Sequence, residues 1–122
     1  MSTFLDKYKE YRGDQKMANR ISKEIEKNIK KYIEEVKKQY SIDKVIIFGS
    51  YAKGEVSENS DIDLAIISPD INDRYDDMAK LMGLTWGIDT RIEPHPIKRE
   101  DFNSKEDYFV KEIINTGINF VI

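Results

Sequence analysis

Gly49, Ser50, Asp61 and Asp63 are the residues of this chain whose types and spacing point most directly to chemistry. An apolar run ends at the glycine–serine pair, and the two aspartates open a second apolar run after a polar loop. Residues two apart on a strand share a face, so we expect the two aspartates to place like charges together. A divalent cation would remove that conflict, because Mg²⁺ prefers carboxylate oxygens and commonly also holds substrate phosphates.

The glycine–serine pair supplies the second half of such a site. Glycine lets the backbone approach a phosphate closely, and the exposed N–H groups at the start of a helix favour an anion. A phosphate-binding turn beside a pair of carboxylates is typical of enzymes that transfer phosphoryl or nucleotidyl groups. The four residues therefore predict metal-assisted chemistry on a phosphate-bearing substrate.

Size and composition narrow the class of protein. The 122 residues, 39% hydrophobic and 35% charged, indicate one globular domain with a densely charged surface. The net charge of −3 does not favour nucleic acid as a partner, and the Lys-rich stretch from Lys16 to Lys38 is interspersed with acids, as on a solvated helix face. The chain contains no cysteine, no apolar run long enough for a bilayer and no signal-peptide pattern, so we expect a cytoplasmic protein without a membrane partner.

Hydrophobic spacing and turn residues predict a single α+β domain over residues 1–122, with an N-terminal helical extension over about residues 1–40. We expect a small mixed sheet of three to four strands flanked by helices. We expect five helices. One begins near Thr3, one covers Met17 to Tyr40, a short one starts at about Ser50, one covers Arg74 to Leu84, and one covers Glu100 to Thr116 with Gly117 at its C-cap. The expected strands are Lys44 to Phe48, Asp61 to Ile67, and Ile88 to Glu93, the last halted by Pro94 and Pro96; the apolar tail from Ile118 to Ile122 follows.

Ten residues separate Ser50 from Asp61, so the stretch has the form Gly-Ser-x10-Asp-x-Asp. With its flanking runs, Phe48 to Gly54 and Ser60 to Leu64, this segment resembles the minimal nucleotidyltransferases of the DNA polymerase beta-like superfamily almost position by position. The likeness spans most residues from about 44 to 117. It implies the nucleotidyltransferase fold and a Mg²⁺-dependent enzyme that moves a nucleoside monophosphate, AMP from ATP or its equivalent from another nucleoside triphosphate, onto an acceptor hydroxyl.

The resemblance also implies roles for individual residues. Gly49 and Ser50 would bind the β- and γ-phosphates of the nucleotide, and Asp61 and Asp63 would hold one or two Mg²⁺ ions. Lys53 stands where the family usually has arginine. Lysine keeps the charge but loses the bidentate fork, so a nucleotide-binding role and an exposed helix lysine are both open.

A third carboxylate normally completes this site from a neighbouring strand, and the sequence offers two candidates. Asp89, at the opening of the expected strand, is our choice for the third catalytic and metal-binding residue, and Glu93 is the alternative. Both share a strand face with Arg91 if the stretch is extended, so a structural ion-pair ladder is also open. His95, the single histidine, lies between two prolines and is interpreted as a structural or surface residue rather than a ligand.

The acceptor is not readable from any residue. Within the resembling family, many short chains act as antitoxins that pair with a small helical HEPN-type ribonuclease toxin and adenylylate one of its tyrosines. The resemblance therefore implies such a partner and acceptor, since 122 residues leave little room for an acceptor-holding domain. Apolar helix faces and the apolar tail are also compatible with a homo-oligomer. The alternative function is a non-catalytic module that binds or scaffolds a partner through its helices.

Overall fold

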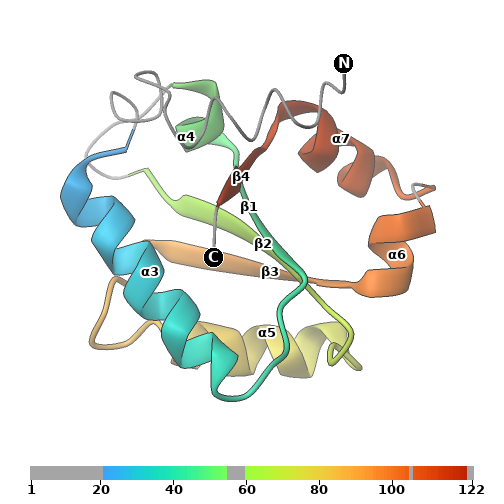
Figure 1. Ribbon diagram of the computed structural model, residues 1–122, viewed down its shortest axis with the longest axis horizontal. Helices are drawn as coiled ribbons and strands as arrows, with labels where there is room; N and C mark the ends of the chain where they lie inside the picture. The colour runs from blue at the N-terminus through green and yellow to red at the C-terminus, as the bar shows by residue number, and fades with distance from the viewer. Residues whose placement is uncertain (1–20, 55–59, 105, 121–122) are drawn as a thin grey trace.

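Four strands form the centre of the protein, in the spatial order β3-β2-β1-β4. The computed structural model describes residues 21–54, 60–104 and 106–120, and every element below lies within these ranges. The strand β1 (Lys44–Phe48) pairs antiparallel with both β2 (Ile62–Ser68) and β4 (Ile118–Phe120), whereas β2 pairs parallel with β3 (Ile92–Lys98). This mixed sheet with its flanking helices confirms the expected α+β class (Figure 1).

Helices cover both faces of the sheet. Figure 1 shows α3 (Lys23–Lys37) and α5 (Arg74–Gly83) on one side, and α6 (Arg99–Ser104) and α7 (Tyr108–Thr116) on the other. Successive residues of β1 divide between two cores accordingly, because Val45 and Ile47 belong to the core under α3 while Ile46 belongs to the core under α7. Within the described part of the chain, no helix is both long and apolar enough to span a membrane.

The helix α3 is amphipathic, and it is capped at its start. Its buried residues, three or four positions apart, are Ile25, Ile29, Tyr32, Ile33 and Val36. The Ser22 hydroxyl accepts a hydrogen bond from the Ile25 N–H at 3.1 Å, which satisfies one free donor of the first turn. The Tyr32 hydroxyl donates to the Leu81 carbonyl at 2.8 Å and ties α3 to α5. The expected long helix is therefore present from Lys23 on, and the segments around Thr3 and Met17 lie outside the described residues.

The third strand differs from the expectation, because it begins later and runs through both prolines. It covers Ile92–Lys98 rather than Ile88 to Glu93. The Arg91 carbonyl accepts the Ile62 N–H at 2.8 Å, so odd-numbered positions of β3 turn their polar groups towards β2. Pro94 and Pro96 fall on even positions, which face the open edge, since β3 is the outermost strand. A missing N–H on that side costs no ladder hydrogen bond.

The C-terminal part also departs from the expectation of one helix from Glu100 to Thr116. It is divided into α6 and α7, and the Asp107 carboxylate caps α7 by accepting hydrogen bonds from the Phe109 and Val110 N–H groups at 2.8 and 3.4 Å. Such short polar side chains favour helix starts over helix interiors. Gly117 follows α7, and a Cβ there would collide with Ile46, so glycine lets β4 approach β1 closely.

Candidate active site

The turn between β1 and the short helix α4 (Ser50–Lys53) depends on Gly49. Its φ of 71° and ψ of −144° lie in a region that is essentially restricted to glycine. A Cβ at this position would also collide with the carboxylate of Asp63 on the neighbouring strand. The glycine is therefore needed twice, for its backbone conformation and for the close approach of Asp63. Ser50 begins α4 directly after it, as the sequence predicts.

Strand register brings Asp63 beside the glutamate that the sequence offered as the alternative third acid. Asp63 lies opposite Phe48 on β1 and opposite Glu93 on β3. Residues opposite each other in adjacent strands share a face, so the carboxylates of Asp63 and Glu93 are neighbours. Asp61 lies just before β2 and is exposed.

The electrostatics of Glu93 show that all three acids converge. Burial raises the pKa of Glu93, the negative charge of Asp63 raises it further, and a hydrogen bond and the charge of Asp61 add to the effect. The nearby His95 acts in the opposite direction on this pKa. The folded protein thus opposes ionisation of Glu93, because its carboxylate is partly buried and lies near the carboxylates of Asp63 and Asp61.

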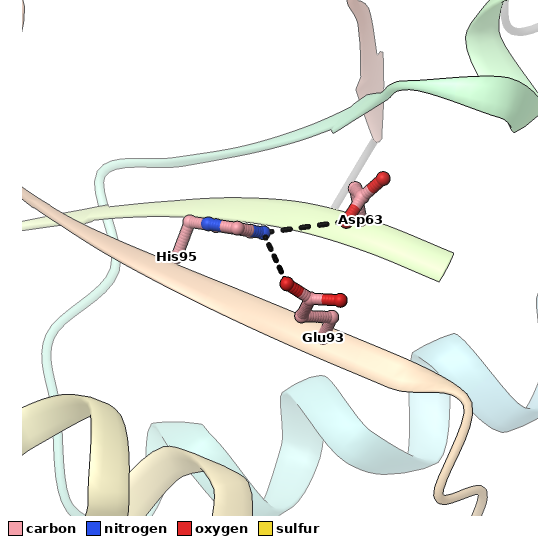
Figure 2. Close-up of side chains that lie close together, drawn as sticks. All are labelled: Asp63, Glu93 and His95. Carbon is pink, nitrogen blue, oxygen red and sulfur yellow. Dashed lines mark hydrogen bonds and ion pairs between the residues drawn. The ribbon is translucent and has the colours of Figure 1, made fainter. Parts of the chain in front are cut away.

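His95 is the member of this cluster that the sequence interpretation missed. Its Nε2 atom lies 3.3 Å from Asp63 Oδ1 and 3.5 Å from Glu93 Oε1, as Figure 2 shows. One carboxylate oxygen from each acid and a ring nitrogen of His95 all lie within 4.8 Å of one another. The residue shares a strand face with Glu93, two positions before it. The two-residue spacing of Glu93 and His95 is visible in the sequence, but it places them on one face only if the strand continues through the prolines.

The imidazole ring of His95 is held by aromatic neighbours. The Phe48 ring lies 5.0 Å away in an edge-to-face arrangement, and the Phe109 ring lies 5.9 Å away. The side chain of His95 is only 16% exposed. Its position is therefore fixed by packing against β1 and α7, and the ring nitrogen faces the carboxylates.

Asp89, our choice from the sequence for the third acid, lies elsewhere. It sits in the turn before β3, and it is buried. Its carboxylate accepts hydrogen bonds from Arg91 Nε at 2.9 Å and Arg91 Nη2 at 2.7 Å, and from the Asn28 amide at 3.1 Å. The hydrogen bonds from Arg91 hold the pKa of Asp89 below its usual range, in spite of burial. Asp89 thus links α3 to the start of β3 and is not one of the residues grouped around Asp63.

The arrangement has the composition of a cation site next to an anion site. Carboxylates and an imidazole are ligands for divalent metal ions, and Asp63, Glu93 and His95 each bring one such atom within 4.8 Å of the others. Asp61 adjoins this group through its hydrogen bond with Glu93. Lys53 is exposed at the last residue of α4, within the same turn region as Gly49 and Ser50. The pairing of the two sites fits a phosphate ester whose charge a metal ion would help to neutralise.

The family model and the similar proteins that sequence comparison finds agree on the family of this chain. Residues 29–121 match the family described as the nucleotidyltransferase domain. A protein of Methanocaldococcus jannaschii named “Putative protein adenylyltransferase MJ0604” is 38% identical over 95 residues, which cover 75% of this chain and 93% of that protein. A second protein of the same organism, “Putative protein adenylyltransferase MJ0141”, is 32% identical over 98 residues, or 78% of this chain and 94% of that protein.

Solved structures show the same fold at low sequence identity. The “Crystal structure of a putative nucleotidyltransferase from Sulfolobus solfataricus” has a TM-score of 0.57 and 20% identity, and the match covers 78% of each chain. The “Crystal structure of the toxin-antitoxin with AMP-PNP” has a TM-score of 0.51 and 22% identity over 77% of this chain and 70% of that chain. At these identities the likeness concerns the fold alone.

The Gly49 turn gives the first testable expectation. Gly49→Ala should lower the free energy of unfolding by about 1–3 kcal/mol, because it introduces backbone strain and a clash with Asp63. Urea unfolding measures this change. The matched control is Gly83→Ala, since a Cβ at Gly83 meets nothing within 4 Å and alanine suits a helix. Equal stability of the two variants would contradict the structural role of Gly49.

The Asp89 contacts predict a pH-dependent stability. The pKa of Asp89 is lower in the folded protein than in the unfolded chain, so its contribution is present above the unfolded value of about 3.9 and is lost as the pH falls through the folded value. Asp89→Asn should cost about 1.5–3 kcal/mol at pH 7, and the difference from wild type should shrink below about pH 4. Thermal unfolding between pH 7 and pH 2 measures this, with the exposed Asp101→Asn as control. A difference that stays constant with pH would count against the assigned contacts.

Proposed function

Because this chain belongs to the nucleotidyltransferase domain family and is a nucleotidyltransferase, we propose that it transfers AMP from ATP to a hydroxyl group of a protein acceptor. The choice of AMP and of a protein acceptor is supported by the names of the two M. jannaschii relatives, over 90% of whose lengths align with this chain. The observation that carries the proposal is the convergence of Asp61, Asp63 and Glu93 at the turn that contains Gly49.

The three carboxylates fit a divalent cation. Burial and the negative charge of the neighbouring acids raise the pKa of Glu93, and bound positive charge would offset this effect. We assign Asp61, Asp63 and Glu93 as the carboxylates that would hold Mg²⁺, with Glu93 in the place that the sequence analysis gave to Asp89. We do not assign Asp89 to this role, since its carboxylate accepts hydrogen bonds from Arg91 and Asn28. When bound, the metal would stabilise the charge of the attacking oxygen and of the pyrophosphate leaving group.

Gly49 and Ser50 are assigned to the triphosphate. The backbone at Gly49 carries no side chain that would hold a phosphate away, and it lies against the carboxylate of Asp63. This closeness supports a site in which the phosphates and the cation would lie at the same end of the sheet. Lys53, one helical turn further on, can add positive charge as a point contact rather than a bidentate clamp.

The proposed reaction is an in-line displacement at the α-phosphorus of ATP. The acceptor oxygen forms a new bond to this phosphorus, the bond to the oxygen that bridges the α- and β-phosphates breaks, and pyrophosphate leaves with the electron pair. We assign Glu93 as the group that takes the proton of the acceptor hydroxyl, since its carboxylate has a second oxygen and its side chain is 39% exposed to an incoming acceptor. Asp61 and Asp63 would help to hold the cation, which would supply positive charge next to the phosphate oxygens.

The finer proposal concerns the acceptor. A structural neighbour, described as a toxin-antitoxin with AMP-PNP, supports a role with a protein partner and an adenine nucleotide. We therefore propose an antitoxin role in which the acceptor is a tyrosine of a small helical HEPN-type partner, as the family resemblance implies. The exposure of Asp61 and of 39% of the Glu93 side chain supports access of such a side chain to the site.

Label transfer tests the proposed reaction. The full chain, Mg²⁺, [α-³²P]ATP and the co-purified partner should give a labelled partner protein, and Asp63→Asn should reduce this labelling at least roughly 100-fold. The exposed Asp101→Asn is the matched control and should label normally. In parallel, [γ-³²P]ATP should transfer nothing, because the γ-phosphate leaves within pyrophosphate. Transfer from the γ-label, or equal labelling by Asp63→Asn, would contradict the proposal and favour a kinase or a non-catalytic binding module.

The crowded carboxylates predict opposite effects with and without metal. Glu93→Gln should raise the thermal midpoint of the metal-free protein, because the folded state disfavours the charge of Glu93 at neutral pH. Wild type should gain about 1.4 kcal/mol in Mg²⁺ at ten times its Kd, and the variant should lose most of this gain. Calorimetry with and without Mg²⁺ measures both effects. The exposed Glu112→Gln should change neither, and an unchanged Mg²⁺ response in Glu93→Gln would remove Glu93 from the site.

A further inference from the structure

One nitrogen of His95 faces two carboxylate oxygens at once. Its Nε2 atom lies 3.3 Å from Asp63 Oδ1 and 3.5 Å from Glu93 Oε1, and Figure 2 shows the ring edge pointing between the two side chains. The three residues come from the same face of two neighbouring strands, β2 and β3. A proton on this nitrogen could donate a well-aligned hydrogen bond to one of the two oxygens, but not to both.

These separations are long for hydrogen bonds between charged groups and short enough for a shared ion. A charge-assisted N–H···O bond usually spans about 2.7–2.9 Å, and a contact at 3.5 Å contributes little. Ligand atoms that surround one cation at about 2.0–2.2 Å lie about 3.0–3.5 Å apart, depending on the geometry. The two nitrogen-to-oxygen distances therefore fall in the range for ligands of a common metal ion, and the two carboxylate oxygens lie within 4.8 Å of each other.

Packing keeps the nitrogen in this position. The ring contacts Phe48 edge-to-face at 5.0 Å and Phe109 at 5.9 Å, and those two rings also contact each other at 5.6 Å. The backbone of His95 is part of β3, next to Ala65 of β2. A small residue opposite the histidine leaves room for the imidazole above the sheet. The ligand is thus placed in advance, with little conformational entropy left to lose when an ion binds.

We propose that His95 is a metal ligand, and that the ion held by Asp63, Glu93 and His95 is a first-row transition-metal dication, bound more tightly than Mg²⁺. The inference rests on the proposed function for the presence of a cation at Asp63 and Glu93. Mg²⁺ favours a shell made of oxygen atoms alone, whereas the imidazole nitrogen adds affinity for ions such as Mn²⁺, Co²⁺ or Zn²⁺. The histidine therefore sets the metal preference of the site.

Mn²⁺ is a suitable probe because this chain contains a single histidine. With any affinity tag removed, the full chain loaded with Mn²⁺ should show a directly coordinated imidazole nitrogen in pulsed electron paramagnetic resonance. Replacing natural histidine with ¹⁵N-histidine should change that coupling, and no other residue would carry the label. Bound Mn²⁺ without imidazole coupling would overturn the proposal, and this measurement needs no variant.

Affinity provides the second readout. His95→Phe keeps a ring next to Phe48 and Phe109 but removes both nitrogens, and it should raise the Kd for Mn²⁺ roughly tenfold or more. Its Kd for Mg²⁺ should change less than about threefold. Lys98→Gln, on the same strand but outside the cluster, is the control and should leave both values unchanged. Equal loss of Mn²⁺ and Mg²⁺ affinity, or no loss of either, would overturn the proposal.

Failure of this inference and failure of the proposed function are distinguishable. Label transfer that depends on Asp63, together with Mn²⁺ binding that lacks imidazole coupling, would leave the nucleotidyl transfer intact and reject only the role of His95. Loss of imidazole coupling in Asp63→Asn would support a shared ion. Absence of metal binding by the wild-type chain would reject both the ligand role of His95 and the carboxylate metal site.

Discussion

The parallel pairing of β2 with β3 is the constraint on which the candidate site depends, because it sets Asp63 directly beside Glu93. A shift of one residue in this register would turn Glu93 and His95 to the opposite face of the sheet. The register is held from both sides. Ile62 and Ile92 are fully or almost fully buried under α3 and α5, and Ile97 packs under α7 on the opposite face. Two separate cores therefore specify a single alignment of the acids.

That alignment places negative charges close together, and the rest of the fold must offset the free energy of their repulsion. Burial and the neighbouring acids raise the pKa of Glu93, which means that the folded state works against its ionisation. Perturbed groups of this kind gather at functional sites more than elsewhere. Asp89 illustrates the other use of a buried acid, since Arg91 and Asn28 satisfy its carboxylate and the residue stabilises the turn that leads into β3. Two acids only four positions apart thus have pKa values that the fold shifts in opposite directions.

The edge position of β3 serves the fold and the site together. Pro94 and Pro96 leave the outer edge of this strand without donors at two positions, which discourages the addition of another strand. Among the described strands none lies beyond β3, and the side chain of Glu93 is 39% exposed, which suits it to contact a ligand. A central strand could not have carried the two prolines, and a covered strand could not have presented the glutamate in this way.

The amino-acid sequence alone determined the local features: the Gly49–Ser50 turn, the paired Asp61 and Asp63, the amphipathic α3 and the strands β1 and β2. These depend on periodicity, glycine and short spacing, which act within a few residues. Only the tertiary structure decided where β3 begins, and with it that Glu93 rather than Asp89 lies beside Asp63, and where His95 lies. The physical reason is that a proline ends a strand only if its missing N–H faces a partner. Which side of β3 has a partner is settled by β2, about thirty residues earlier in the chain.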